Sequence, residues 1–298
     1  MTLSIVMYHY VRDGARVHAR TTAELEAQLD HLASRYTVVG LEAVRARSWP
    51  DDACLLTFDD GLVDHLEVVA PALARRGMTG VFCAAAAAVL DRRVLDVQKS
   101  QFVLAASQDH DALARRIFEL VPGEDESALR ERWTLPHRYD PPRKVLVKRL
   151  LQDGLPEPER TRALGTLFAE LVSDDERAFA DRLYLDVDGL RELAAMGMDL
   201  AGHGRHHRRL ALLDEAGQRE EIEGSVRMLE AALGERPRDW TMCFAYGSRD
   251  ETSLRLLREA GCAVGLTTEP RVATREDSLL ELPRLDTNDL PVEVVERT

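Results

Sequence analysis

Short apolar runs alternate along this chain with longer segments in which apolar residues recur every three or four positions. The first pattern is typical of buried β-strands, and the second of helices that pack one face against a sheet. The apolar runs predict strands at Leu3–Tyr8, Thr37–Val39, Cys54–Phe58, Gly80–Ala84, Asp199–Gly202, Trp240–Phe244, Ala263–Thr267 and, for a short one, Leu280–Leu282. Because strands and helices alternate, we expect a parallel sheet or barrel, whose active site lies at the carboxyl ends of the strands.

Residues that begin and end helices flank the amphipathic segments. Thr21 and Glu24 form a capping-box pattern at the start of a helix predicted over Thr22–Tyr36. Glycines directly follow the other predicted helices, which are Asp64–Arg76, Glu215–Leu233 and Glu251–Ala260. These boundaries support a repeating order of strand and helix.

One long segment interrupts this order. From about Val97 to Leu185 the sequence is rich in proline and charge and shows helical patterns but no good strand. We predict a helical insertion at about 97–185, between two barrel strands of a single domain that spans residues 1–298. Arg138, Arg143 and Lys148 are candidates for shaping a substrate cleft, with a packing or oligomer surface as the alternative.

Composition excludes some classes of protein. The 298 residues are 45% hydrophobic, enough for the core of one large α/β domain. A net charge of -13 repels phosphate backbones, so we expect no nucleic-acid partner. The N-terminus has no basic region typical of a signal peptide, and the apolar stretch at Val81–Leu90 is about half the roughly 20 residues of a membrane-spanning helix. We therefore expect a cytoplasmic protein without a transmembrane segment.

The cysteines do not form a recognisable metal or redox motif. Each lies inside an apolar run and none belongs to a CxxC pair; they are Cys54, Cys83, Cys243 and Cys262. This pattern predicts buried free thiols on strands.

Asp59 and Asp60 end a predicted buried strand, directly before Gly61. Two adjacent carboxylates in this position are costly unless a positive charge lies between them, and a metal ion is the simplest such partner. Gly61 allows the chain to turn so that both side chains face one cavity. On this motif alone, exposed aspartates that cap the next helix are the alternative.

A second predicted strand runs directly into a histidine-rich segment. His203 and His207 are four residues apart, so we expect them on one face of a helical turn, where they can share an ion, while His206 points away. With Asp60 they would form a set of three ligands that leaves positions open for water and substrate. A surface patch of histidine and arginine is the alternative.

The segments Thr57–Gly61 and His203–His207 together resemble the motifs of polysaccharide deacetylases of the NodB-homology class, carbohydrate esterase family 4. The resemblance covers most of the chain outside the insertion and implies a distorted (β/α)7 barrel. It implies that Asp59 is the general base and that Asp60, His203 and His207 bind a divalent metal ion, for which we expect zinc. The implied reaction removes an N-acetyl group from an amino sugar and releases acetate.

A later motif of the family matches less well. Trp240 stands where an arginine usually tethers the base, and Ala245 stands where a proline is usual. The resemblance gives the backbone N–H of Phe244 to the oxyanion hole and makes Tyr246 a substrate-orienting residue. Arg284, near a later strand end, is a candidate to replace the missing arginine, with a solvated arginine as the alternative.

The general acid needs a separate assignment, because no histidine follows His207 where the family has a Leu-x-His motif. The segment Met7–Val11 resembles the Tyr-His-x-Val signature of a rearranged subgroup, which makes His9 the candidate acid. Asp286 is a candidate carboxylate to orient it. His65 is the second candidate acid, and a structural role in a turn or core is the alternative for His9.

Two other functions fit the same residues. An amidohydrolase of small cyclic or linear amides would keep the metal site and change the substrate. A carbohydrate-binding protein with a degenerate site would need no base, so the presence of Asp59 argues against it. For a deacetylase, we expect the substrate to be a polysaccharide, a nucleotide- or lipid-linked sugar precursor, or a small glycosylated metabolite.

Overall fold

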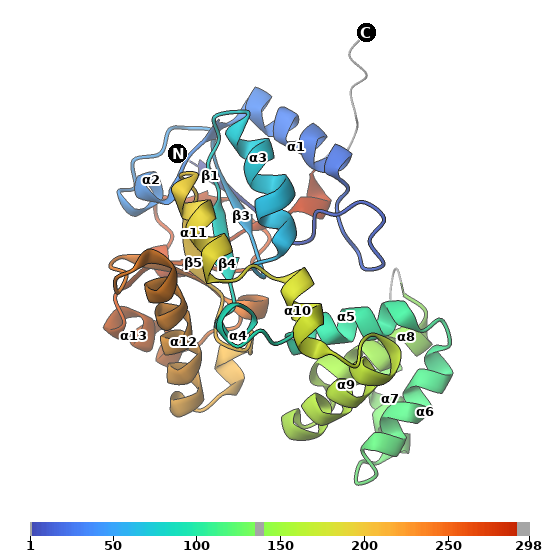
Figure 1. The fold of residues 1–298 in the computed structure, drawn as a ribbon. Helices are drawn as coiled ribbons and strands as arrows, with labels where there is room; N and C mark the ends of the chain where they lie inside the picture. The colour runs from blue at the N-terminus through green and yellow to red at the C-terminus, as the bar shows by residue number, and fades with distance from the viewer. Residues whose placement is uncertain (1, 135–139, 291–298) are drawn as a thin grey trace. The chain divides into compact units, whose positions relative to one another are not determined.

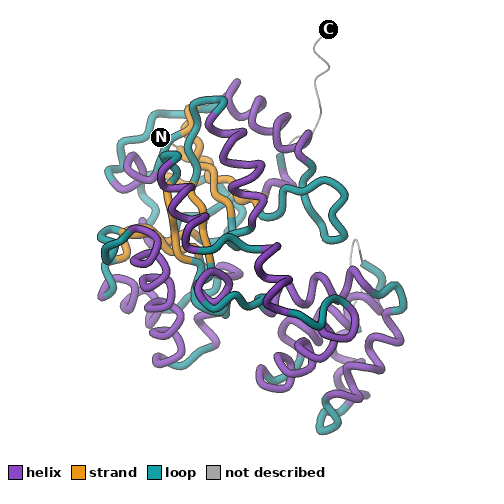
Figure 2. The backbone as a smooth tube through the Cα atoms, in the orientation of Figure 1, coloured by secondary structure: helices purple, strands orange, loops and turns teal. Residues whose placement is uncertain are grey.

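The structure is a computed structural model that describes residues 2–134 and 140–290. The chain divides into two compact units, one made of residues before 94 and after 179, the other of residues 94–179. In the first unit, a curved sheet is surrounded by helices (Figures 1 and 2). This sheet carries the residues singled out by the sequence motifs.

The sheet is mainly parallel. Its strands are β1 (Thr2–Tyr8), β2 (Thr37–Val38), β3 (Ala53–Phe58), β4 (Val81–Ala84), β5 (Asp199–Gly202), β6 (Trp240–Cys243), β7 (Cys262–Leu266), β8 (Ala273–Thr274) and β9 (Leu285–Asp286). They are hydrogen-bonded in the order β7-β6-β5-β4-β3-β1-β8, with β2 beside β3 and β9 beside β1. Among the described strands only the β1–β8 pair is antiparallel, so the carboxyl ends of β1 and β3 to β7 lie at one edge.

The central strands are buried on both faces, which explains why their sequences are continuous apolar runs. Leu56 and Phe58 of β3 pack into a core shared with the surrounding helices. Leu55 points the other way, into a second core that combines interior residues of several strands, including Cys83 and Cys243, with side chains of residues 41–49. Alternate residues of each strand therefore face the interior of the curved sheet.

The segment that follows β7 connects the two edges of the sheet. Leu282 pairs with Leu266 of β7, and Leu285 and Asp286 pair with β1. The predicted strand at Leu280–Leu282 is wrong in its type, because a 3-10 helix, η5 (Leu279–Glu281), occupies most of it. After η5, regular strand pairing resumes at β9.

The helices of the first unit lie outside the strands (Figure 1). They are α1 (Thr22–Arg35), α2 (Leu41–Arg45), α3 (Ala70–Ala74), α4 (Ala86–Leu90), α11 (Val187–Ala195), α12 (Glu215–Leu233) and α13 (Glu251–Glu259). The capping box of Thr21 and Glu24 is confirmed, and Gly234 ends α12 in a left-handed conformation. The predicted helix at Asp64–Arg76 begins with a π-helical turn, η1 (His65–Val69), before α3. Further 3-10 turns are η3 (Leu210–Leu212), η4 (Ala245–Gly247) and η6 (Thr287–Asp289).

The second unit is helical, and its described residues contain no strand. Its elements are α5 (Asp96–Ala106), α6 (His110–Leu120), α7 (Glu126–Trp133), α8 (Pro142–Arg149), η2 (Leu150–Gly154), α9 (Glu157–Leu171) and the start of α10 (Glu176–Leu183). The helical character expected of the segment is thus observed, while its description as part of a single domain stays a prediction.

The basic residues proposed for a substrate cleft have partners inside the helical unit. Arg143 is paired with Asp111 at 2.7 Å and Lys148 with Asp140 at 3.4 Å. Arg138 lies outside the described residues. Their contribution to a cleft stays a prediction. In the described part of the chain, no helix is both long enough and apolar enough to span a membrane.

Candidate functional site

The residues of both sequence motifs follow neighbouring strands that end together. Tyr8 of β1 is the register partner of Phe58 of β3, and the N–H of Asp59 donates to the Tyr8 carbonyl over 2.9 Å. β4 and β5 end together in the same way, where the N–H of His203 donates to the carbonyl of Ala84. The motifs therefore meet at one edge of the sheet, as the parallel arrangement predicts.

Asp60, His203 and His207 form a buried cluster. Nε2 of each histidine lies 3.6 Å from the same carboxylate oxygen, Oδ1 of Asp60, and the potential ligand atoms all lie within 4.8 Å of one another. These distances exceed the roughly 3.2 Å limit of an ordinary N–H···O hydrogen bond. A tetrahedral ion with bonds of about 2.0–2.1 Å holds its ligand atoms about 3.4 Å apart. The spacing and the donor types therefore fit a divalent metal ion.

The orientation of His203 also suits a ligand. Its Nδ1 lies 2.8 Å from the Cys243 carbonyl, which can only accept, so the neutral ring keeps its proton on Nδ1 and a lone pair on Nε2. Burial lowers the pKa of His203, but the Cys243 sulfur and the Asp59 and Asp60 carboxylates outweigh it and raise this pKa to about 10. The surroundings of the ring thus stabilise a positive charge at the place that an ion would occupy.

The two histidines do not lie on a helical turn, and that prediction is wrong. Residues 203–207 form a loop in which Gly204 has φ 80° and His207 has φ 59°, both in the left-handed region. This loop brings the rings of His203 and His207 edge to face, with their centroids 4.6 Å apart. His206 points elsewhere, to within 3.7 Å of Glu220. Asp60 likewise has φ 80°, a strained conformation that is typical of functional sites.

Two buried side chains of α12 hold this loop in place. The Glu221 carboxylate accepts hydrogen bonds of 2.9 Å from the N–H groups of Arg205 and His206, and the Ser225 hydroxyl accepts one of 3.0 Å from Gly204. A Cβ atom on Gly204 would lie 2.7 Å from the Glu221 carboxylate, so the close approach requires glycine. Glu221 and Ser225 were not predicted; the signal in the sequence was an acid and a hydroxyl four positions apart on the buried face of a helix.

Arg284 holds Asp59 in a buried bidentate ion pair. Its Nη1 and Nη2 donate to the two carboxylate oxygens over 2.9 Å each, its Nε donates to the Thr267 carbonyl, and Nη1 also donates to the Thr57 hydroxyl. Burial raises the pKa of Asp59, but the charges of Arg284 and His203 hold it well below its usual range. The structure therefore places Arg284 where a tether for the base was expected, and it is not a solvated arginine.

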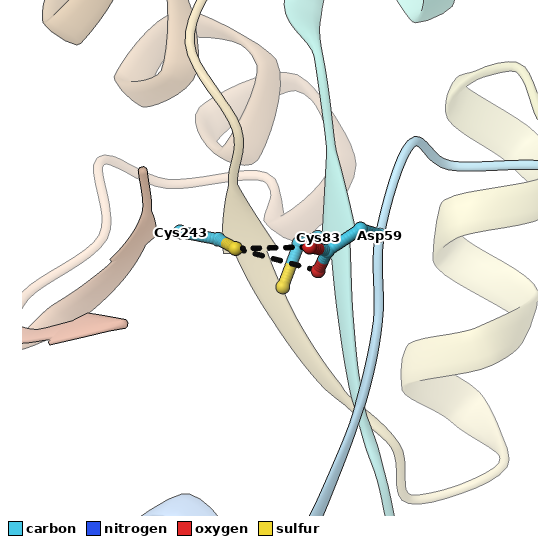
Figure 3. A group of neighbouring side chains, drawn as sticks. All are labelled: Asp59, Cys83 and Cys243. Atoms are coloured by element: carbon cyan, nitrogen blue, oxygen red, sulfur yellow. Dashed lines mark hydrogen bonds between the residues drawn. The ribbon is translucent and has the colours of Figure 1, made fainter. Parts of the chain in front are cut away.

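Two thiols lie against Asp59 (Figure 3). Sγ of Cys243 is 3.3 and 3.4 Å from the two oxygens of Asp59, and Sγ of Cys83 completes a buried group of three potential ligands within 4.8 Å of one another. The prediction of buried free thiols on strands is confirmed for all four cysteines. Their place beside Asp59 was not predicted, because each apolar run was considered without its neighbours.

His9 directly follows β1 and therefore lies next to Asp59, which directly follows β3. It is partly exposed, and its carbonyl oxygen is 3.1 Å from Nε2 of His65. His65 is fully buried and burial lowers its pKa to about 4, so it is neutral at neutral pH and already engaged. His9 remains the candidate acid. Asp286 accepts hydrogen bonds from the backbone and side chain of Asn288, and its predicted pairing with His9 stays a prediction.

The loop after β6 differs from the expectation in one respect. The N–H of Phe244 donates to the Leu266 carbonyl over 2.9 Å, so it is engaged between β6 and β7. The structure does not support its assignment to the oxyanion hole. Tyr246 has φ 58° and places its ring edge to face with His207, at 4.7 Å between centroids. Tyr246 therefore lies at the cluster, whereas Trp240 belongs to the core under the helices.

Comparisons with known proteins agree with this geometry. The family model for polysaccharide deacetylases matches residues 168–265, a range that includes His203 and His207 but not Asp59. No curated protein matches the chain.

Several solved structures are similar in fold to this chain. Streptococcus pyogenes deacetylase PplD, solved in complex with acetate, has 15% identity and a TM-score of 0.58 over 96% of this chain and 92% of its own. IcaB from Ammonifex degensii has 16% identity and a TM-score of 0.58 over 96% and 91%. The BpsB deacetylase domain from Bordetella bronchiseptica has 16% identity and a TM-score of 0.55 over 96% and 95%. The predicted distorted (β/α)7 barrel is confirmed by these neighbours.

Proposed function

We propose that this chain, whose resemblance to polysaccharide deacetylases of the NodB-homology class is confirmed, is a metal-dependent hydrolase that removes the N-acetyl group of an amino sugar. The observation that carries the proposal is the cluster of Asp60, His203 and His207 beside the tethered carboxylate of Asp59. Three protein ligands with an adjacent base are the arrangement that hydrolysis at a metal ion requires.

The residues of the cluster define which ion fits. Two imidazole nitrogens and one carboxylate oxygen are ligands that zinc and neighbouring divalent transition metals accept, and we expect zinc. When bound, such an ion lowers the pKa of a coordinated water and polarises a carbonyl group. Asp60, His203 and His207 would hold it, with the His203 ring fixed through its Nδ1–H and the Cys243 carbonyl.

The remaining steps belong to side chains around the cluster. Asp59 accepts a proton from the attacking water, and Arg284 fixes the direction of its carboxylate and keeps it ionised. His9, at the neighbouring strand end, donates a proton to the departing nitrogen, because an amide anion is a very poor leaving group. The products are acetate and a free amino sugar.

A polar cavity near the ends of β1 and β3 offers partners to a sugar, although its lining does not include Asp59, Asp60 or the two histidines of the cluster. It has a volume of about 560 Å³ and is lined by residues that follow β1 and β3 and by two residues of α10. Most of its lining side chains are charged: Arg12, Asp13, Asp64, Glu67, Asp181 and Arg182. Such a surface offers hydrogen bonds to many hydroxyl groups. It is consistent with a polysaccharide or a nucleotide- or lipid-linked sugar as the substrate.

Acetate release across a substrate panel tests the proposed function. The panel contains N-acetylated oligosaccharides, nucleotide-linked and lipid-linked N-acetyl sugars, and small cyclic and linear amides. We expect release from an N-acetyl sugar by wild-type protein and its loss in Asp60→Ala. Release from small amides alone would indicate that the protein is an amidohydrolase and not a sugar deacetylase. A metal-loaded protein that releases acetate from no member but binds sugars would indicate a carbohydrate-binding protein.

A further inference from the structure

We propose that Asp59, Cys83 and Cys243 form a second metal site, which binds a soft divalent ion such as Cd²⁺ and thereby blocks the general base. The residues are distinct from Asp60, His203 and His207, although the two sites are adjacent. Cys243 links them, since its sulfur contacts Asp59 and its carbonyl accepts the Nδ1–H of His203.

The spacing of the three side chains fits an ion. Sγ of Cys243 lies 3.3 and 3.4 Å from the oxygens of Asp59, and Sγ of Cys83 faces the same point, with all three ligand atoms within 4.8 Å (Figure 3). With the bond lengths of tetrahedral zinc, about 2.3 Å to sulfur and about 2.0 Å to oxygen, sulfur and oxygen ligands are about 3.5 Å apart, and a larger soft ion spaces them slightly farther apart. Little movement is therefore needed to admit an ion.

The backbone positions of Cys83 and Cys243 disfavour a disulfide between the two thiols. Cys83 is on β4 and Cys243 is on β6, and β5 lies between these strands. At about 4.8 Å per strand, their Cα atoms are separated by about 9–10 Å, beyond the roughly 7 Å that a disulfide spans. Both thiols therefore remain available as ligands without movement of the backbone.

The charges at this position also suit a divalent ion. Arg284 occupies one lone pair on each oxygen of Asp59, and a carboxylate has further lone pairs for a metal. The negative charges of two thiolates and one carboxylate equal the positive charges of a divalent ion and the Arg284 guanidinium. The filled site is therefore neutral. Buried charges are tolerated when each is paired with an opposite charge in this way. Each ion bound releases the two thiol protons to solvent.

The donor types separate the two sites. Thiolates favour soft ions, although they also bind zinc, whereas the carboxylate and imidazoles of the first site suit borderline ions such as zinc. A soft ion at the second site uses the lone pairs through which Asp59 would accept a proton. Binding of that ion should therefore abolish hydrolysis even when the first site is filled.

Titration with Cd²⁺ tests the second site, with bound cadmium and the ultraviolet charge-transfer absorption of cadmium thiolates as readouts. We expect wild-type protein to bind two ions per chain with this absorption, and Cys83→Ala and Cys243→Ala to bind one ion without it. Cys262→Ser is the matched control, because this buried thiol lies on β7 and contacts backbone groups of Val264 and Met242 rather than Asp59. It should behave as wild type. One ion without thiolate absorption in wild-type protein would overturn the proposal.

A second variant keeps the test decisive if the cysteine variants do not fold. His207→Ala weakens the first site without touching the thiol group, and it should still bind Cd²⁺ with full thiolate absorption. Folded His207→Ala protein without that absorption would contradict the second site. Neither readout uses a substrate. Absence of the second site would therefore not contradict the proposed deacetylation, and absence of deacetylation would not contradict the second site.

Discussion

Arg284 and Asp59 are 225 positions apart in the sequence, yet they are joined by two hydrogen bonds of 2.9 Å in the interior of the sheet. Arg284 reaches this place because it lies between Leu282, which pairs with β7, and Leu285, which pairs with β1. The segment that connects the edges of the sheet therefore also positions the candidate base.

Loss of Arg284 should destabilise the protein and make Asp59 easier to protonate. In Arg284→Met the carboxylate stays buried without its partner, and we expect the free energy of unfolding at neutral pH to fall by about 3–5 kcal/mol. Because Arg284 lowers the pKa of Asp59 in the folded state, its contribution is present above the unfolded pKa of about 3.9 and is lost as the pH falls towards the folded value. Denaturant unfolding of wild type and variant at several pH values measures this difference. An equal difference at pH 3 and pH 7 would contradict the assignment.

The same variant should alter the pH profile of activity. With Arg284 removed, the pKa of Asp59 rises, so the acidic limb of kcat/KM should move to higher pH. Arg284→Lys keeps the charge but not the paired hydrogen bonds, and we expect an intermediate shift. An unmoved acidic limb in folded Arg284→Met would show that Asp59 does not act as the base.

Asp59→Asn should separate catalysis from metal binding. The first site does not use Asp59, so we expect metal content at the wild-type level, with kcat reduced by at least ~10²-fold, the low end for a general base. Elemental analysis and steady-state kinetics measure the two effects. Near-normal turnover with metal bound would remove Asp59 from the mechanism.

Glu221→Gln should weaken metal binding without contacting the ion. Glu221 holds the N–H groups of Arg205 and His206 between the two histidine ligands, and outer partners of this kind typically contribute about 10–100-fold in affinity. A competition titration with a zinc chelator measures this loss. Glu230→Gln is the matched control, an exposed glutamate on the same helix, and should bind as wild type. Equal zinc affinities for the wild type, Glu221→Gln and Glu230→Gln would show that the loop does not need Glu221 to position the histidine ligands.

His9→Ala should retain metal and reduce amide hydrolysis more than ester hydrolysis. An aryl ester has a good leaving group and needs no proton, whereas an amide nitrogen must be protonated as it departs. The variant should also lose the alkaline limb of the kcat/KM profile. Equal losses on an O-acetyl aryl ester and on an N-acetyl sugar would indicate a structural role for His9.

Local patterns were sufficient for most of the barrel. Runs such as Cys54–Phe58 located strands because a buried parallel strand is apolar on both faces, and the bounds of α12 followed from its amphipathic pattern and Gly234. The motif residues Asp60, His203 and His207 were brought together as expected, although by a loop with left-handed residues that helical spacing did not predict.

The other features of the site depend on which strands are neighbours and in what register. The local sequence does not specify this. Whether the N–H of Phe244 is free depends on the register of β6 against β7. Cys83 and Cys243 approach Asp59 only because interior positions of separate strands converge. Arg284 could be proposed as a tether from its place near a strand end, but its contact required knowledge of how the sheet closes.

The central claim is that Asp60, His203 and His207 hold an ion on which hydrolysis of an N-acetyl sugar depends. Its most direct test is acetate release by chelator-treated protein before and after addition of one equivalent of Zn²⁺. We expect no acetate release by the metal-free protein and recovery with one bound ion per chain, without recovery in Asp60→Ala. Full activity of the metal-free protein on an N-acetyl sugar would contradict it.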